Sequence, residues 1–255
     1  MTSKAAERVR ILSKKFRLPT VADEVERRFV EAGFPEALET LAEVFEAEDG
    51  SRGERRVERL RKQSRLPMDK TFSTLDLNRL PASLRHKIRE LAEGLFATEA
   101  HNVLAFGLPG TGKTHAVSAI GHALVEAGRP VLFTPAYKLV QELLSAKRDL
   151  QLPKMLKKLD KFEVLILDDI GYVQQSPEEV EVLFTLLAER YERRSLVITS
   201  NLVFSEWDQI FKNPMTTAAA IDRVVHHSSI LEFDVESFRA EQAKLRKKKG
   251  KSNDN

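Results

Sequence analysis

The segment GLPGTGKT at residues 107–114 constrains the fold of this chain more than any other feature. Its glycine, lysine and threonine spacing is that of a Walker A motif. The apolar run at 102–106 predicts a strand before it, and residues 115–124 predict a helix after it. Glycines let the backbone turn so that N–H groups point at phosphate oxygens, and the helix N-terminus adds a favourable dipole. The sequence therefore predicts a phosphate-binding loop inside an α/β domain.

Within this loop we expect Lys113 to reach the terminal phosphates and Thr114 to ligate magnesium. A chance glycine-rich turn is the alternative, and the flanking strand and helix argue against it. We therefore expect ATP and Mg²⁺ as cofactors. The other residues of the expected nucleotide-binding set are Gly107, Pro109, Gly110, Thr111, Gly112 and His115.

Two acids, Asp168 and Asp169, follow the apolar run at 164–167. Ligands of open α/β sheets bind at the carboxyl ends of the strands, where these acids should lie. We expect Asp168 to hold magnesium, directly or through water, and Asp169 to orient or polarise the attacking water. Taken alone, the pattern also fits a strand that merely stops at two acids, but its place downstream of the Walker A motif favours function.

Two further residues are candidates for the same reaction. Asn201 ends the apolar run at 196–200 and would hydrogen-bond the γ-phosphate or the water, if that strand lies between the first two. The alternative is an asparagine that simply begins a turn. Arg223 would supply its guanidinium, which stays charged and matches phosphate oxygens, to the ATP of a neighbouring subunit. Its spacing alone favours a surface arginine paired with an acid.

Five short apolar segments, near 102–106, 131–134, 163–167, 196–200 and 229–233, alternate with helical patterns. This alternation predicts a mostly parallel sheet covered on both faces. We expect a helical N-terminal domain at 1–66, the ATPase domain at 67–238 and a frayed basic tail at 239–255. Within the N-terminal domain, Pro19 predicts a helix start and the Asp-Gly-Ser sequence at 49–51 predicts a break.

The composition bounds the environment and the partners. The 255 residues contain no cysteine, which excludes disulfides and thiolate metal sites. No apolar run approaches the ~20 residues that span a bilayer, and we expect a soluble cytoplasmic protein. The histidines at 115, 122, 226 and 227 do not form a convincing metal set.

The net charge is only +3, but basic residues cluster between the second and third strands, at Lys147, Arg148, Lys154, Lys157, Lys158 and Lys161. Such a cluster can bind nucleic-acid phosphates, although a solvated face is the commoner reason for one.

The motifs GLPGTGKT with His115, LILDDIG, VITSN and IDRVVHH occur in an order that resembles the IstB family, the ATPase helpers of transposition in bacterial insertion sequences. That family is similar to the helicase loaders DnaC and DnaI. The resemblance covers residues 67–238 well and the helical front part more loosely. The pair Asp168 and Asp169 departs from the Asp-Glu pair commoner in AAA+ proteins, which bears on the catalytic role of Asp169.

The resemblance implies an AAA+ fold without a C-terminal lid domain, a homo-oligomer with ATP between subunits, and Arg223 as an arginine finger. It also implies double-stranded DNA as a ligand, contacted by the basic stretch at 147–161, and an IstA-like transposase as a partner in a bacterial cytoplasm. A DnaC-like replicative helicase loader is the alternative function. A DnaI-type loader is disfavoured because its zinc-binding N-terminal domain needs cysteines. A third possibility is a nucleotide-binding scaffold with negligible turnover.

Overall fold

The computed structural model describes residues 3–172, 176–211, 214–238 and 241, and the chain divides into two compact units, Met1–Arg59 and Leu60–Asn255. The division lies seven residues before the boundary expected at 66/67 (66 − 59 = 7). The reason is that Leu60 and Leu66 are buried among the apolar residues of the larger unit. The expected basic tail at 239–255 falls, apart from Glu241, outside the described residues.

The smaller unit consists of α1 (Lys4–Lys15), α2 (Pro19–Glu31) and most of α3 (Ala37–Ser64). The helix start predicted at Pro19 is confirmed, and proline suits this position because the first helical N–H groups lack helical partners. The three helices enclose a small core of Ala5, Ala6, Val9, Val25, Leu38 and Ala42.

The break predicted at residues 49–51 is wrong, because α3 continues through them without interruption. Glycine inside a helix costs about 1 kcal/mol relative to alanine. Ion pairs on the helix surface offset part of this cost, since Arg52 and Arg55 both contact Glu48. The Arg52 guanidinium also lies 4.2 Å from the centre of the ring of Phe16, the residue that follows α1. Contacts that the local sequence does not reveal therefore outweigh the glycine.

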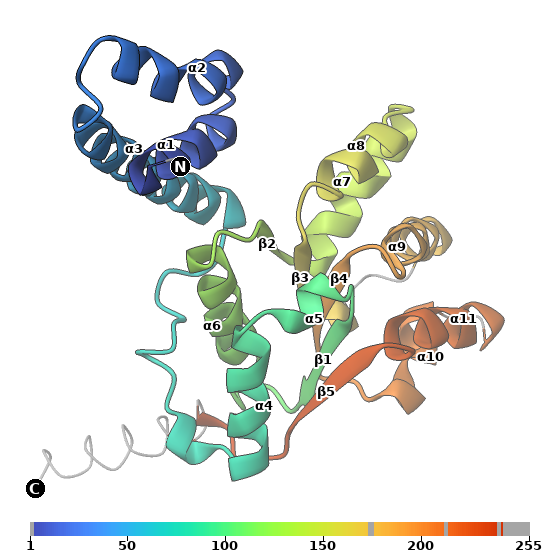
Figure 1. The fold of residues 1–255 in the computed structure, drawn as a ribbon. Helices are drawn as coiled ribbons and strands as arrows, with labels where there is room; N and C mark the ends of the chain where they lie inside the picture. Colours follow the sequence, from blue (N-terminus) through green and yellow to red (C-terminus); the bar gives the residue numbers. More distant parts are fainter. Residues whose placement is uncertain (1–2, 173–175, 212–213, 239–240, 242–255) are drawn as a thin grey trace, which may run out of the picture. The chain divides into compact units, whose positions relative to one another are not determined.

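The larger unit contains a five-stranded parallel sheet in the order β2-β3-β4-β1-β5 (Figure 1). The strands are β1 (Asn102–Gly107), β2 (Val131–Pro135), β3 (Val164–Asp168), β4 (Ser195–Ser200) and β5 (Ser228–Phe233). Each strand lies within one or two residues of its predicted segment. As predicted, β4 lies between β1 and β3, which brings three strands that end in candidate site residues next to one another.

The helices of this unit cover both faces of the sheet (Figure 1). They are α4 (Ala82–Ala92), α5 (Leu95–Thr98), α6 (Lys113–Glu126), α7 (Ala136–Arg148), α8 (Leu152–Leu159), α9 (Pro177–Arg190), α10 (Asp208–Phe211) and α11 (Pro214–Val225), with short 3-10 turns η1 (Leu77–Arg79), η2 (Ile170–Tyr172) and η3 (Phe204–Glu206). No helix in the described part of the chain is long and apolar enough to cross a membrane.

Alternate residues along each strand enter two separate apolar cores, because successive strand side chains point to opposite faces. On β1, Leu104 and Phe106 pack with α7, α9 and α11, whereas Val103 and Ala105 pack with α4 and α6. The three-layer arrangement confirms the predicted parallel sheet covered on both faces. It also places the carboxyl ends of all five strands along one edge.

Arg190, the last residue of α9, closes the opposite edge near the amino ends of β3 and β4. Its side chain is buried, and its two terminal nitrogens donate to four backbone carbonyl oxygens. These belong to Leu159, Phe162, Glu163 and Ser195. Burial lowers the pKa of the guanidinium to about 9, so it remains charged at neutral pH. Arg190 therefore joins α8, β3 and β4 through their backbones.

Candidate nucleotide-binding site

A cavity of about 470 Å³ opens at the carboxyl ends of β1, β3 and β4. It is lined by four groups of residues that the topology brings together: the Walker A loop, the strand ends, a connector segment before α4 and the segment after β5. The lining residues that sequence reasoning predicted are Pro109, Gly110, Thr111, Gly112, Lys113, Thr114, His115, Asp169 and Asn201. A volume of this size lies within the range of small-molecule sites.

Three glycines of the Walker A loop have positive φ angles. Gly107, Gly110 and Gly112 have φ values of 151°, 85° and 102°. At Gly107 a Cβ atom would lie 2.6 Å from the carbonyl oxygen of Phe233 on β5, so no larger residue fits there. Gly112 precedes the first residue of α6 and directs the loop into that helix. The loop thus forms the strand-to-helix turn that the motif predicts, with the N-terminus of α6 facing the cavity.

Lys113 folds back over this loop. Its side chain is only 5% exposed, and Nζ donates to the carbonyl oxygens of Gly107 and Leu108 at 2.6 and 2.9 Å. A buried ammonium group needs such partners. The contacts hold the positive charge beside the loop that the sequence assigns to phosphate binding.

Asp168 accepts hydrogen bonds from two hydroxyl groups. Thr114 Oγ1 and Thr199 Oγ1 donate to the same oxygen, Asp168 Oδ1, at 2.8 and 2.7 Å. Thr199 Oγ1 in turn accepts the backbone N–H of Asp169 at 2.8 Å. Sequence reasoning missed Thr199, although it lies in the VITSN motif two residues before Asn201. Its hydroxyl links the two acids to β4 and fixes their positions.

Asp169 and Asn201 complete the polar wall of the cavity. Asp169 has a φ of 57°, which sharply redirects the chain after β3, and its side chain lines the cavity. Among the described residues, the buried Oδ1 of Asn201 has no hydrogen-bond partner. Asn201 is one of the residues that line the cavity, and its Oδ1 packs against Gly171, where an added Cβ atom would lie 2.5 Å from it.

This donor set fits the expected cofactors. Mg²⁺ prefers hard oxygen ligands and keeps several waters, and the Thr114 hydroxyl and Asp168 carboxylate are such ligands within 2.8 Å of each other. The glycine loop and Lys113 provide N–H groups and a cation for phosphate oxygens. Asn201 lines the same cavity beside these groups.

The mouth of the cavity involves residues that sequence reasoning did not predict. His115 Nε2 lies 3.1 Å from the Thr71 carbonyl oxygen and 3.0 Å from Thr74 Oγ1, which attaches the connector to α6. On the other side, the N–H of Phe238 donates to the Gly110 carbonyl oxygen at 3.0 Å. The Arg79 guanidinium lies 4.9 Å from the centre of the Phe238 ring. Segments from before and after the sheet therefore meet at the loop.

Arg79 also pairs with Glu241 at 2.6 Å, so it contacts the C-terminal segment at two points. Both Arg79 and Phe238 line the cavity. No sequence motif marks either residue, because their proximity arises only when the strand order is known.

Arg223 lies apart from this cavity, on α11, and is not one of the lining residues. Its guanidinium stacks 4.7 Å from the centre of the Phe184 ring on α9, and Nη1 donates to the Ala219 carbonyl oxygen at 3.5 Å. Within one chain the structure therefore brings Lys113, Asp168, Asp169 and Asn201 together and leaves Arg223 outside.

The predicted basic cluster lies on α7 and α8, around an open groove of about 820 Å³. Lys147 is half-buried and pairs with Glu181, so its charge is engaged. Arg148, Lys154, Lys157 and Lys158 are exposed and form no ion pair with the residues that the structure describes. Lys154, Lys157, Lys158 and Lys161 line the groove together with Glu142 and Asp149.

Comparison with known families decides the affiliation of the chain. The model of the IstB-like ATP binding protein family matches residues 13–246. The chain belongs to this family. A relative from Sinorhizobium fredii, whose name refers to an insertion sequence and to ATP binding, is 41% identical over 244 residues, covering 92% of this chain and 80% of the relative. The ATP-binding protein named for insertion sequence IS21 of Pseudomonas aeruginosa is 39% identical over 204 residues, covering 80% and 77%.

Solved structures share the fold of this IstB-like chain. The DnaC helicase loader matches with a TM-score of 0.56 at 18% identity, covering 66% of this chain and 98% of the loader. DnaI matches with a TM-score of 0.54 at 23% identity, covering 66% and 95%. These matches confirm the AAA+ P-loop fold. Within the described residues, only a short segment follows β5, and it forms no lid domain.

Proposed function

We propose that this IstB-like protein hydrolyses ATP between subunits, assembles on duplex DNA in the ATP-bound state and assists the transposase of an insertion sequence. The observation that carries the ATPase part is the hydrogen-bonded set of Thr114, Asp168 and Thr199 beneath the Walker A loop. The insertion-sequence names of the relatives support the transposition part.

The roles of the residues in hydrolysis follow from their positions. Thr114 and Asp168 would hold Mg²⁺, which supplies positive charge to the phosphates when it is bound. Asp169 orients the attacking water and accepts its proton, while the Asn201 side chain hydrogen-bonds the γ-phosphate or that water. Thr199 keeps both acids in position through its two hydrogen bonds. Lys113 stabilises the charge on the terminal phosphates.

Arg223 acts on the ATP of a neighbouring subunit, because it lies outside the cavity of its own chain. We expect Arg223→Ala to leave ATP affinity within about twofold and to lower hydrolysis by about 10³-fold, the lower end of the range for arginine fingers. Mixing this variant with Asp169→Asn should restore partial activity, since one interface of a mixed assembly retains both groups. No recovery at any mixing ratio would exclude a shared site.

The exposed lysines of α8 provide the DNA surface in this proposal. They carry positive charge without competing partners among the described residues, and each phosphate contact releases counterions on binding. The groove also contains Glu142 and Asp149, so we expect the backbone of the duplex to lie on the lysine side.

The decisive experiment is fluorescence anisotropy with labelled duplex and single-stranded DNA of equal length, with ATP, with ADP and without nucleotide. Tight binding to duplex that requires ATP would support the proposal and direct a partner search to the transposase. Preference for single strands, or no DNA binding, would favour the DnaC-like helicase loader, the second candidate. The shared fold with DnaC is compatible with both, because fold alone does not determine the ligand.

A lysine variant tests the surface itself. Lys157→Ala/Lys158→Ala should reduce the slope of log affinity against log salt by about 1 for each lysine that contacts a phosphate. Lys14→Ala/Arg89→Ala is the matched control, since it removes two exposed charges elsewhere. Equal salt-dependence slopes for the two variants would place the DNA on another surface. ATP hydrolysis measured without DNA should be unchanged in both variants.

A further inference from the structure

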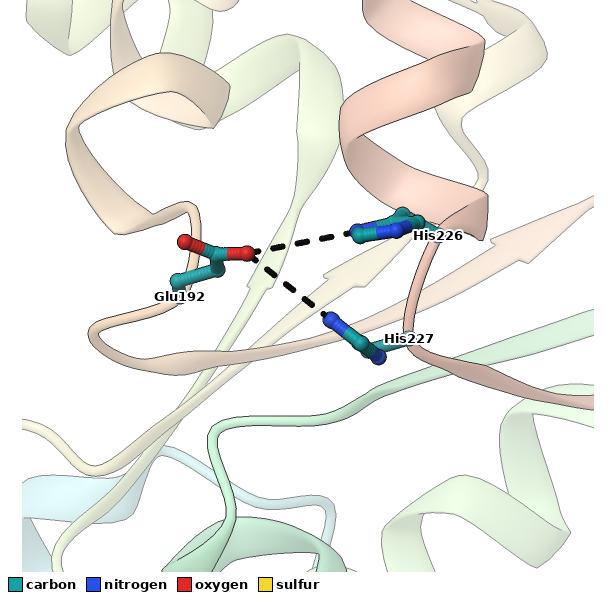
Figure 2. A group of neighbouring side chains, drawn as sticks. All are labelled: Glu192, His226 and His227. Carbon is teal, nitrogen blue, oxygen red and sulfur yellow. Dashed lines mark ion pairs between the residues drawn. The ribbon is translucent and has the colours of Figure 1, made fainter.

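Glu192, His226 and His227 converge at the edge of the sheet opposite the nucleotide cavity (Figure 2). Glu192 lies in the turn between α9 and β4, and the two histidines lie in the turn between α11 and β5. The sequence pattern did not indicate a metal set here because the carboxylate lies far upstream of the two imidazoles. Only the pairing of β1 with both β4 and β5 brings the two turns together.

The potential ligand atoms face one another. Glu192 Oε1 lies 4.0 Å from His226 Nδ1 and 3.8 Å from His227 Nε2, and one ligand atom from each residue lies within 4.8 Å of the others. In Figure 2 both imidazoles point a nitrogen toward the carboxylate. Tetrahedral zinc with bonds of about 2.1 Å requires ligand atoms roughly 3.4 Å apart, so side-chain movements of about 1 Å or less close the site. All three residues are exposed and free to make such movements.

Neighbouring groups orient the imidazoles. The His101 ring stacks on His227, with centres 5.2 Å apart and planes 12° from parallel, and His101 itself pairs with Glu99. The Tyr191 hydroxyl lies 3.0 Å from His226 Nδ1. The Tyr191 hydroxyl contacts the same nitrogen of His226 that faces Glu192, so it must leave this nitrogen when a metal binds there.

We propose that Glu192, His226 and His227 bind a divalent transition metal ion, zinc being the best match, with water in the remaining position. Two imidazoles and one carboxylate suit zinc, and three protein ligands leave one coordination position open. The ion joins the turn after α9 to the end of α11. Arg223 lies on α11 three residues before His226, so the ion also fixes the helix that carries this arginine.

The test uses the full chain without an affinity tag, stripped of metal and supplied with excess Mg²⁺ so that the nucleotide site does not compete. Zinc affinity is measured by competition with a chromophoric chelator, and cobalt absorption reports the geometry. We expect one equivalent of zinc, with at least tenfold weaker binding in Glu192→Gln, His226→Ala and His227→Ala. His86→Ala, which removes an exposed histidine on α4, should bind zinc like the unchanged protein. Tyr191→Phe, which removes the hydroxyl beside His226 Nδ1, should bind zinc at least as tightly.

Thermal unfolding gives a second readout that needs no enzymatic activity. Zinc at a hundredfold excess over its dissociation constant should raise the Tm of the unchanged protein by about 5 °C and leave that of His226→Ala/His227→Ala unmoved. The proposal is overturned if the protein binds no stoichiometric zinc, or if the double variant binds it equally well. All three side chains are exposed, so we expect the variants to fold like the unchanged protein. Their circular dichroism spectra check this.

Discussion

The two edges of the parallel sheet both carry buried polar groups, but they use them differently. At the amino edge the terminal nitrogens of Arg190 are consumed by four backbone carbonyls. At the carboxyl edge Thr199 donates to Asp168, and the neighbouring Asp169 and Asn201 line a cavity. A polar group that donates to the backbone of several elements stabilises the fold, whereas polar groups that line a cavity can bind a ligand. Substitutions at the two edges should therefore separate stability from activity.

The largest effect should come from Asp169→Asn, at the carboxyl edge. Loss of the carboxylate that orients the water should lower phosphate release by about 10³-fold, while ATP affinity and Tm stay nearly unchanged. Phosphate release and nucleotide titration on the same preparation measure both quantities. Unchanged release would support the scaffold interpretation, in which the protein binds nucleotide without turning it over. Glu206→Gln, on η3 and outside the cavity lining, is a matched control.

Arg190→Met should show the opposite separation. It preserves most of the apolar volume but leaves buried carbonyls without donors, so we expect a loss of about 3 kcal/mol in the free energy of unfolding. Burial lowers the pKa of Arg190 in the folded protein only to about 9, so below pH 9 the guanidinium is protonated in both the folded and the unfolded protein. The loss should therefore be constant from about pH 6 to pH 8 in urea titrations. A loss that varies with pH in this window would contradict the assignment.

Arg193→Met is the control for that measurement. Arg193 pairs with Asp160 and Glu189 on the surface, where an ion pair is worth about 1 kcal/mol or less. Comparable losses in the two variants would remove the contrast between the edges.

Lys113→Ala should weaken ATP binding about 100-fold, since the phosphates lose the point charge beside the loop. Loss of a hydrogen bond to a charged group in a buried site costs about 3 kcal/mol of binding free energy, which corresponds to about 100-fold weaker affinity. Calorimetric titration with ATP measures it, and Lys138→Ala, on the exposed side of α7, serves as control. Equal affinity in both variants would exclude Lys113 from the phosphate site.

Thr199→Val should have the smallest effect, and it should lower both the stability of the fold and the rate of hydrolysis. Valine keeps the shape of the side chain but removes the hydroxyl that donates to Asp168 and accepts the N–H of Asp169. We therefore expect a loss of about 1 kcal/mol in the free energy of unfolding and about tenfold slower hydrolysis. Thr134→Val is the control, because Thr134 is buried on β2 and its hydroxyl contacts only a backbone carbonyl of the next residue. A Thr199 variant with unaltered turnover would make this residue purely structural.

The sequence predicts those features that lie at strand ends or in contiguous motifs. The Walker A loop, the two acids and Asn201 could be assigned because parallel strands bring their carboxyl ends to one edge. The proximity of Arg79 to Phe238 and of Glu192 to His226 depends on strand order and loop paths, which no local pattern encodes. The uninterrupted α3 also depends on side-chain contacts, which outweigh the local preference of Gly50.

The hydrogen bond from Phe238 to Gly110 has a practical consequence for anyone who works with this protein. The chain leaves the sheet across the rim of the nucleotide cavity, so a fusion or cut just beyond that point alters the entrance through which the cofactor passes. Because the segment after β5 contacts the Walker A loop, a label on this segment can report nucleotide binding. A fluorescent dye attached at position 241, whose glutamate pairs with Arg79 of the cavity lining, would report the arrival and departure of the nucleotide.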